Sequence, residues 1–235
     1  IRFDYMVFQT KLDDHEVQFA MFVMPLAILG ILIASAVAMF EGHLKRLLAS
    51  SSIAQIGYIL LGVSFVSLAG LTASAMHIFN HALAKGGLFL AVACLAYQYR
   101  DLRLNQLGGA SARMPWTCAA FVVCGLSLIG VPGTAGFISK WVLINAALES
   151  GAWGWALVAI ILVSSLMAVV YIWRIVEALY FQEPVEGNDQ ISEAPIQILL
   201  VTGLVAVLNI YFGLFPQVPL ELANSAAVLL LEGSR

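Results

Sequence analysis

The sequence predicts an all-α membrane protein, a bundle of about six transmembrane helices in which the fourth helix is broken. Of its 235 residues, 61% are hydrophobic and only 11% are charged, whereas soluble domains carry about 25% charged residues. The apolar residues gather in long runs, and about 20 such residues suffice for a helix to cross a bilayer. The net charge of −3 gives no indication of a nucleic-acid partner. We therefore expect an integral membrane protein surrounded by lipid.

The first part of the chain divides into a loop and three apolar spans. Residues 1–18 have a mixed composition and predict an aqueous loop. Apolar runs over residues 19–40, 47–68 and 71–97 are each long enough to cross a bilayer. The second run begins with the polar sequence SSSIAQIGY, whose side chains can form hydrogen bonds between helices where hydrocarbon offers no partner.

A glycine-rich interruption divides the fourth apolar region, residues 116–148. The sequence GVPGTAGF contains Gly130, Pro132, Gly133 and Gly136, and these residues predict a break in the helix. Inside a bilayer, such a break is tolerated only where protein or water satisfies the freed backbone groups. We therefore expect this part of the bundle to be covered by protein or to line a wet interior.

The last third of the chain contains two more spans and a short tail. The fifth span covers residues 153–181, an acidic loop covers residues 182–194, and the sixth span covers residues 194–215. Residues 220–231 are apolar but too short to cross a bilayer. We expect this tail to lie on the membrane or to pack on the bundle.

The distribution of basic residues predicts the orientation of the bundle. Lys45 and Arg46 follow the first span and three arginines follow the third, whereas the loops after the second and fourth spans contain no Lys or Arg. Cytoplasmic loops of membrane proteins are enriched in basic residues. We therefore expect the loops after the first and third spans, and the acidic loop after the fifth, to face the cytoplasm. Both ends of the chain then lie on the other side.

Three titratable side chains interrupt the third span. His77, His81 and Lys85 are spaced four residues apart, so a helix places them on one stripe. Each ionisable group at mid-membrane costs about 2.5–3.5 kcal/mol on insertion scales, and such groups usually face protein or water. Histidine titrates near neutral pH, and a desolvated lysine can release its proton in a similar range. The stripe predicts a proton path; the alternative is that these side chains only bond neighbouring helices together.

Further candidates lie near the break and at the start of the second span. Lys140 follows the break, where exposed backbone and water are expected, and is the second candidate for the proton path; the alternative is an ordinary interfacial lysine. Lys45 is a candidate for connecting the path to the cytoplasm, with Glu41 and His43 supplying protons to it. Orientation and contact with lipid headgroups provide the alternative explanation for Lys45.

The sequence contains no motif for redox, metal or nucleophilic chemistry. Cys94, Cys118 and Cys124 lie in apolar stretches and form no CxxC pair, a pattern typical of small buried side chains. There is no GxGxxG motif after a strand, no Walker A sequence and no HExxH. We therefore expect no cofactor, no metal and no catalytic residue, so that the chain is not an enzyme by itself.

Three stretches of the sequence together carry a family resemblance. LKRLLASSSIAQIGY, HIFNHALAKGGLFL and GVPGTAGFISKW follow one another between residues 44 and 141. In this order they resemble the antiporter-like membrane subunits shared by respiratory complex I, Mrp-type Na⁺/H⁺ antiporters and membrane-bound hydrogenases. The NIYFG stretch of the sixth span is similar to the D-type member of the Mrp branch.

The resemblance implies a fold of about fourteen spans with two five-helix repeats of inverted topology, each with one broken helix. It implies that residues 19–182 form the second repeat, and that residues 183–235 form the acidic loop, the terminal transmembrane helix and the tail. The first repeat, with its Glu–Lys pair, then lies outside this chain, which we expect to be part of a longer protein. One departure is Gly133, which stands where many family members have a second proline.

The resemblance also implies roles for the candidate residues. The family's central relay corresponds to His77, His81 and Lys85. Its exit-side lysine in the broken helix corresponds to Lys140, and the basic residue that begins the preceding helix corresponds to Lys45.

The partners and the activity follow from the same resemblance. We expect one subunit of a larger complex in the bacterial plasma membrane, among other membrane subunits. The complex would be a redox-driven, proton-pumping NADH-quinone oxidoreductase or a cation/proton antiporter. The subunit would translocate H⁺ or exchange it for Na⁺; the alternative is a structural membrane scaffold that conducts no ions.

Overall fold

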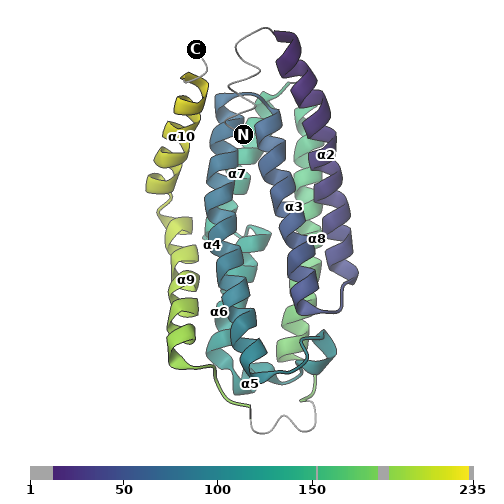
Figure 1. Ribbon diagram of the computed structural model, residues 1–235, viewed down its shortest axis with the longest axis vertical. Helices are drawn as coiled ribbons and strands as arrows, with labels where there is room; N and C mark the ends of the chain where they lie inside the picture. Colours follow the sequence, from purple (N-terminus) through teal and green to yellow (C-terminus); the bar gives the residue numbers. More distant parts are fainter. Residues whose placement is uncertain (1–12, 152, 185–190, 233–235) are drawn as a thin grey trace.

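The computed structural model describes residues 13–151, 153–184 and 191–232. Within these ranges the regular elements are helices, apart from an isolated β-bridge between His43 and Arg103. The long helices run alternately up and down in one elongated bundle (Figure 1). The elements are α2 (Asp13–Phe40), α3 (Leu44–Ser64), α4 (Leu68–Gln98), η1 (Leu104–Gln106), α5 (Ala110–Arg113), α6 (Pro115–Ile129), α7 (Ala135–Glu149), α8 (Gly154–Tyr180), α9 (Ile196–Leu214) and α10 (Gln217–Glu232).

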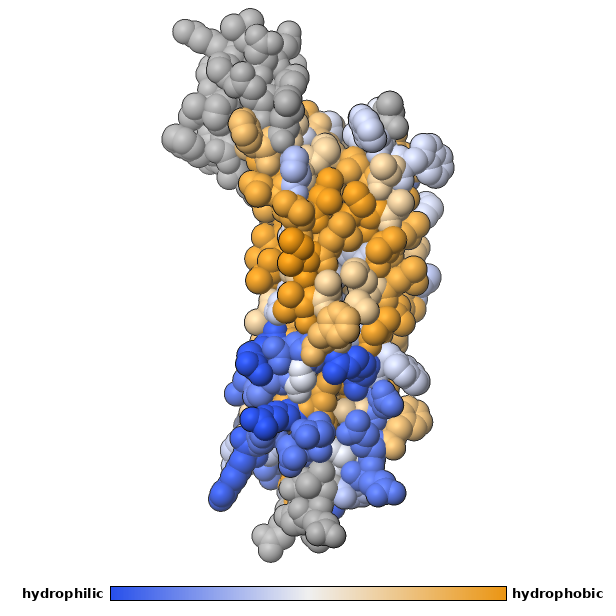
Figure 2. Space-filling model, turned by 90° about the vertical axis from the view of Figure 1, so that its right-hand side faces the viewer, coloured by the Kyte–Doolittle hydropathy of each residue, from blue (hydrophilic) through white to orange (hydrophobic). Residues whose placement is uncertain are grey.

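The predicted membrane bundle is confirmed. Five helices of the described part are long and apolar enough to cross a membrane, namely Phe22–Phe40 within α2 and the whole of α3, α4, α8 and α9. The fourth predicted span consists of α6 and α7, two helices of 15 residues each that follow one another along the bundle (Figure 1). Seen from the side, a broad apolar band lies above a hydrophilic lower end (Figure 2).

Some helix boundaries differ from the predicted ones. α2 begins at Asp13, so residues 13–18 belong to the first helix and not to an aqueous loop; residues 1–12 of that loop lie outside the described residues. α3 ends at Ser64, earlier than predicted, because the next helix has its own cap. The Ser67 hydroxyl accepts a hydrogen bond from the Gly70 amide at 3.1 Å and caps the start of α4.

The apolar tail forms a helix that packs on the bundle. α10 continues the direction of α9 and contacts α4 (Figure 1). The Thr72 hydroxyl donates a hydrogen bond to Asn224 at 3.4 Å, and Ala227 packs against Val63 and Leu71. The sequence allows the tail either to lie on the membrane or to pack on the bundle, and in the structure it packs on the bundle.

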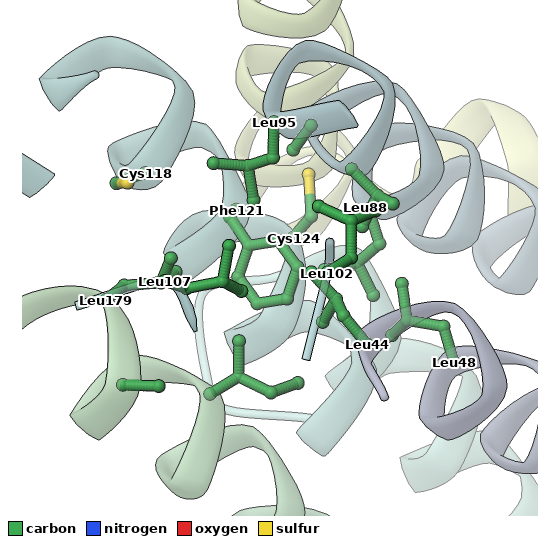
Figure 3. Close-up of a cluster of buried hydrophobic side chains, with 14 of the residues drawn as sticks. Leu44, Leu48, Leu88, Leu95, Leu102, Leu107, Cys118, Phe121, Cys124 and Leu179 are labelled. Atoms are coloured by element: carbon green, nitrogen blue, oxygen red, sulfur yellow. The ribbon is translucent and has the colours of Figure 1, made fainter. Parts of the chain in front are cut away.

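An apolar layer fills the bundle between α3, α4 and α6 (Figure 3). Leu44 and Leu48 come from α3, Leu88 and Leu95 from α4, and Phe121 from α6, and each is 0% exposed. Burying a large apolar side chain contributes about 1.5–3 kcal/mol. These five side chains, which we call the apolar plug, therefore stabilise the bundle and exclude water from this part of it.

Basic residues gather at one end of the bundle, the lower end in Figure 1, which we call the basic end. Its members in the loops and helix ends are Lys45, Arg46, Arg100, Arg103, Arg113 and Arg174. In α8, Arg174 donates hydrogen bonds to the backbone carbonyls of Met39 and Glu41, the latter at 3.2 Å. Carbonyls at a helix C-terminus lack partners within their own helix, so this arginine closes the end of α2.

The break between α6 and α7 depends on its glycines. Gly130 ends α6 with φ +91°, a left-handed conformation that favours glycine, and Gly133 has φ +88°. Pro132 lies exposed between them. Gly136 packs so closely on α6 that a Cβ atom would overlap the carbonyl oxygen of Ser127. The break therefore holds the C-terminus of α6 directly against the first turn of α7.

Replacing Gly136 by alanine is expected to destabilise the protein, whereas Gly203→Ala is not. The methyl group at position 136 would overlap the Ser127 carbonyl, and overpacking of this kind costs about 1–3 kcal/mol. Gly203 in α9 has nothing within 4 Å of its Cβ position, so alanine there is expected to be neutral or to stabilise by up to about 1 kcal/mol. Thermal unfolding of the purified protein in detergent compares the two, and equal midpoints would contradict close packing at the break.

Candidate functional site

The titratable side chains of the predicted stripe and of the broken helix lie in one interior region. His77 and Lys85 on α4 and Lys140 on α7 have only 2%, 5% and 6% of their surface exposed. His81 is partly buried. Because α4 contacts α7, the structure brings both predicted groups of residues together.

Lys85 is held by α3 without a carboxylate partner. Its ammonium group donates a hydrogen bond to the Leu48 carbonyl at 2.7 Å and a second to the Ser51 hydroxyl. The same nitrogen lies 5.9 Å from the centre of the Phe89 ring, where a cation–π contact is favourable. Within the described residues, Lys85 is therefore a buried cation, or a buried amine, whose hydrogen-bond acceptors are neutral oxygens.

His77 links three helices. Its Nδ1 atom lies 3.0 Å from the Ser139 hydroxyl of α7, and its Nε2 atom lies 3.1 Å from Oε1 of Gln55 in α3. The rings of His77 and His81 stack with an interplanar angle of 8° and centroids 6.3 Å apart. Both ring nitrogens of His77 are therefore engaged by side chains other than His81.

The Ser139 hydroxyl allows His77 to exist with or without its extra proton. Gln55 Oε1 is an acceptor, so His77 Nε2 carries a hydrogen, and a neutral ring then accepts the Ser139 hydrogen at Nδ1. A charged ring donates from Nδ1 to Ser139, whose hydroxyl hydrogen turns to the Gly136 carbonyl 3.1 Å away. The hydrogen bonds of His77 can therefore adapt to proton uptake by the rotation of one hydroxyl group.

Lys140 closes the end of α6. Its ammonium group has three acceptors: the carbonyls of Leu128 at 3.2 Å and Ile129 at 2.7 Å, and the Ser165 hydroxyl of α8 at 3.0 Å. An ammonium group has three hydrogens, so all of them are used. The last carbonyls of a helix also carry the negative end of its dipole. This site is therefore built for a cation, although its three acceptors include no carboxylate.

The helix break and Lys140 form one unit. An unbroken helix would use the Leu128 and Ile129 carbonyls internally, whereas Gly130 ends α6 and leaves them free for the lysine. A Cβ atom at Gly130 would lie 2.9 Å from Cδ of Lys140, so a larger side chain would displace it. Tyr58 completes the unit, with its ring centre 5.2 Å from Lys140 Nζ and 5.4 Å from the centre of the His77 ring.

Lys140 also lines a groove on the outer face of α7 and α8. The groove has a volume of about 380 Å³ and is otherwise almost entirely apolar, with Trp141, Leu162, Ser165 and Leu166 among its walls. The side chain is only 6% exposed, and its ammonium group is held at the end of α6 by its three hydrogen bonds. Lys140 thus belongs to the interior of the bundle and not to its lipid-facing surface.

Glu41, His43 and Lys45 lie at the basic end, apart from the interior group. Glu41 accepts hydrogen bonds from the backbone amides of Gly42 and His43 at 2.9 Å each and pairs with Arg46 at 3.2 Å. The His43 amide is the main cause of the lowered pKa of the Glu41 carboxyl. Glu41 and His43 line a polar pocket of about 510 Å³, whereas Lys45 is exposed.

Several contacts of the site have no clear signal in the sequence. Ser139 and Ser165 lie in largely apolar stretches, and only the packing of α7 on α4 and α8 gives them partners. Gln55 and Tyr58 carry a weak signal, since residues three apart share one face of a helix, and both contact His77.

The described residues provide no site for a metal ion. No three His, Cys, Asp or Glu side chains of residues 13–151, 153–184 and 191–232 come together in a group able to hold one. Cys94, Cys118 and Cys124 are buried free thiols. The titratable groups that meet inside the bundle are imidazoles and amines, which are side chains able to take up and release protons.

A family comparison fits this arrangement. The sequence model of the family described as "NADH:quinone oxidoreductase/Mrp antiporter, TM" matches residues 4–168. The chain belongs to this family. The matched region contains both the broken helix and the stripe of His77, His81 and Lys85. The family resemblance predicted from the sequence is confirmed.

Individual relatives come from both branches named by the family. A protein of Desulforudis audaxviator named NADH-quinone oxidoreductase subunit N is 41% identical over 157 residues, which cover 67% of this chain and 31% of the relative. A protein of the same name from Desulforamulus reducens is 33% identical over 210 residues, 89% of this chain and 43% of the relative. The solved Mrp complex from Dietzia sp. DQ12-45-1b contains a chain with a TM-score of 0.83 and 25% identity, covering 91% of this chain and 48% of that one. The chain thus spans less than half the length of these relatives.

The neutral form of His77 is expected to be the Nε2–H tautomer, because Gln55 Oε1 can only accept. ¹⁵N NMR of histidine-labelled protein distinguishes the two tautomers. Gln55→Leu removes the acceptor and is expected to allow a mixture, whereas His43 at the basic end serves as an internal control whose signals stay unchanged. Finding the Nδ1–H tautomer in the unmodified protein would contradict the assigned contacts.

Proposed function

We propose that this chain is the proton-conducting part of a membrane subunit that works inside a larger complex. The observation that carries the proposal is the buried contact between His77, Ser139 and the helix break that holds Lys140. Lys85 and His81 extend it along α4. A bundle that needed only polar contacts for packing would not need four titratable groups in its interior, since each is costly in a membrane.

The mechanism follows from the acceptors of each group. A proton on His77 turns the Ser139 hydroxyl toward Gly136, and its departure turns the hydroxyl back. Lys140 binds the proton as an ammonium group, with three acceptors ready for its hydrogens, and gives it up as an amine. Because the described hydrogen-bond partners of Lys85, His77 and Lys140 include no carboxylate, positive charges on these groups repel one another. A proton arriving at one group therefore favours release from the next.

Proton movement against a membrane potential requires energy from elsewhere. A charge crossing 100 mV exchanges about 2.3 kcal/mol with the field, and the described residues include no redox or nucleotide site. We propose that companion membrane subunits provide the coupling. The two sequence relatives favour a complex of the NADH-quinone oxidoreductase type, and the Mrp complex is the alternative. The transported ion is H⁺, with exchange for Na⁺ in the Mrp case.

The basic end is proposed to face the cytoplasm and to provide access for protons. This orientation follows from the gathering of arginines and lysine there. The polar pocket with Glu41 and His43 is the access site, and Lys45 lies beside it on α3. The apolar plug lies between this pocket and Lys85, whose partner Leu48 is itself a plug residue. Protons therefore reach Lys85 only when water enters the plug.

A structural scaffold is the second candidate function. The saturated hydrogen bonds of Lys140 and the complete apolar packing of the plug favour it, because both would serve a rigid bundle. A scaffold would tolerate loss of the titrating groups as long as packing is kept. The two functions therefore differ in the response to isosteric replacement.

Lys140→Met and Lys85→Met are expected to lower proton flux through the assembled complex by at least about tenfold, since each removes a proton-binding group. Flux is measured as collapse or build-up of a pH gradient in vesicles that contain the whole complex. The matched control is Thr202→Val, which alters a buried polar residue of α9 outside the group and is expected to keep the rate. Unchanged flux in both lysine variants would defeat the proposal and favour the scaffold.

His43→Leu in the same vesicles tests the access pocket at the basic end. His43 lines that pocket together with Glu41, so replacing its imidazole ring by an apolar side chain is expected to slow proton uptake from the basic-end side. Uptake is measured with the pH gradient imposed from that side. A rate equal to that of the unmodified complex contradicts access through this pocket.

A further inference from the structure

The end of α9 packs directly on the turn that breaks the fourth span. Gly213 in the last turn of α9 is buried, and a Cβ atom there would lie 2.5 Å from both the carbonyl oxygen of Gly133 and the Cα atom of Thr134. Cβ atoms in proteins do not come this close to other atoms, and both neighbours belong to the backbone, so no side-chain rotation could make room. Only a residue without a side chain therefore fits between α9 and the turn.

This contact differs from ordinary packing between membrane helices. Small residues commonly let two such helices approach each other, whereas Gly213 approaches a turn. Irregular backbone at bilayer depth has to be covered by protein or water. Pro132 on one side of the turn is exposed, whereas Thr134 is buried. The end of α9 is therefore part of the protein cover that the break requires.

Side-chain contacts fix the position of α9 beside this turn. Asn209, one helical turn before the contact, is 0% exposed, and its amide nitrogen lies 3.4 Å from the Leu83 carbonyl oxygen of α4 and 3.8 Å from Cys124 Sγ of α6. The ring of Phe212 meets the ring of Phe79 on α4 edge to face, with centroids 5.1 Å apart. α9 therefore cannot shift on the bundle without losing contacts to α4 and α6.

The same turn joins the two parts of the Lys140 site. The carbonyls of Leu128 and Ile129 precede the turn, and Lys140, which donates to both, follows it on α7. The turn is closed by the amide and hydroxyl groups of Thr134, which donate to the Val131 carbonyl at 3.2 and 2.7 Å. The position of the ammonium group relative to its carbonyl acceptors therefore depends on the shape of the turn that α9 covers.

We infer that Gly213 is a positioning residue of the Lys140 site, through which α9 holds the turn so that the Leu128 and Ile129 carbonyls stay directed at the ammonium group. The sixth span is then a working part of the conducting unit, although none of its side chains titrates there. The effect on proton flux rests on the proposed proton-conducting function. The effect on the surroundings of Lys140 does not depend on that function.

Gly213→Ala tests the positioning role without changing any titrating group. The added methyl group forces the turn or α9 to move. In vesicles with the whole complex, flux at equal assembly is expected to fall at least about tenfold, since misplacing a reacting group by about 1 Å can cost about 100-fold in rate. The matched control is Gly203→Ala, the same substitution in the same helix, where nothing in the described structure lies within 4 Å of the Cβ position. This control is expected to keep wild-type flux.

A second readout separates positioning from loss of stability. In ¹⁵N NMR of lysine-labelled protein, the Nζ signal that disappears in Lys140→Met belongs to Lys140, and its frequency is expected to change in Gly213→Ala. Gly154→Ala is the control for overpacking as such. A Cβ atom at position 154 would lie 2.5 Å from the Ala147 carbonyl oxygen, at the far end of α7 and roughly 20 Å from the turn. This control is expected to lower the midpoint of thermal unfolding and to leave the Lys140 signal unchanged.

The outcomes separate this inference from the proposed function. An unchanged Lys140 signal in Gly213→Ala would overturn the positioning role, whatever the flux, and loss of flux in Lys140→Met would then leave proton conduction standing. A signal that changes equally in Gly154→Ala would also overturn the positioning role, because the change would then report only lower stability. A signal that changes in Gly213→Ala alone, with wild-type flux in both lysine variants, would support the positioning of Lys140 and defeat proton conduction.

A density map of the unmodified complex covers the case in which Gly213→Ala does not assemble. Gly213 is expected to lie in van der Waals contact with the Gly133 carbonyl, with no other molecule between α9 and the turn. A lipid chain or a helix of another subunit between them would overturn the inference.

Discussion

The structure depends on a buried ammonium group that is satisfied by backbone carbonyls. Lys140 takes the place of the next helical turn at the end of α6, and its described acceptors are two carbonyls and a hydroxyl group. A charge at this depth is expensive without strong partners, and the free end of a helix is one of few such partners that a membrane interior can offer. The shape of the helix break and the packing of α7 follow from the need to provide these acceptors for Lys140.

The glycines of the break, the packing of α7 and the hydroxyl groups all serve the same contact. Gly130 frees the carbonyls, Gly136 lets α7 approach α6, and Ser139 stands next to Lys140 to meet His77 on α4. The titratable groups extend over about two turns of α4, from His77 to Lys85. Beyond Lys85, toward the basic end, the apolar plug closes the bundle, so the proposed conduction alternates between a polar centre and a dry barrier that water must enter.

The sequence predicts the spans, the break and the stripe well, because each rests on a local property. The length of the apolar runs identifies the membrane-spanning helices, and Gly130 and Pro132 mark the break. A spacing of four residues places His77 and His81 on the same face of a helix. What depends on packing between helices is not visible in one sequence. Three contacts depend on the arrangement of the whole bundle: the hydrogen bonds of His77, the capping of α2 by Arg174, and the packing of α10 on α4. The start of α2 at Asp13 differs from the prediction because polar residues continue a helix beyond its apolar part.

The position of Lys140 Nζ in a high-resolution structure of the assembled membrane complex tests the central claim most directly. We expect hydrogen bonds to the carbonyls of Leu128 and Ile129 and to the Ser165 hydroxyl, with the side chain inside the bundle. The alternative position is defined by the groove between α7 and α8, which the same side chain lines. An ammonium group turned into that groove toward lipid, with the end of α6 satisfied by other groups, would contradict the account.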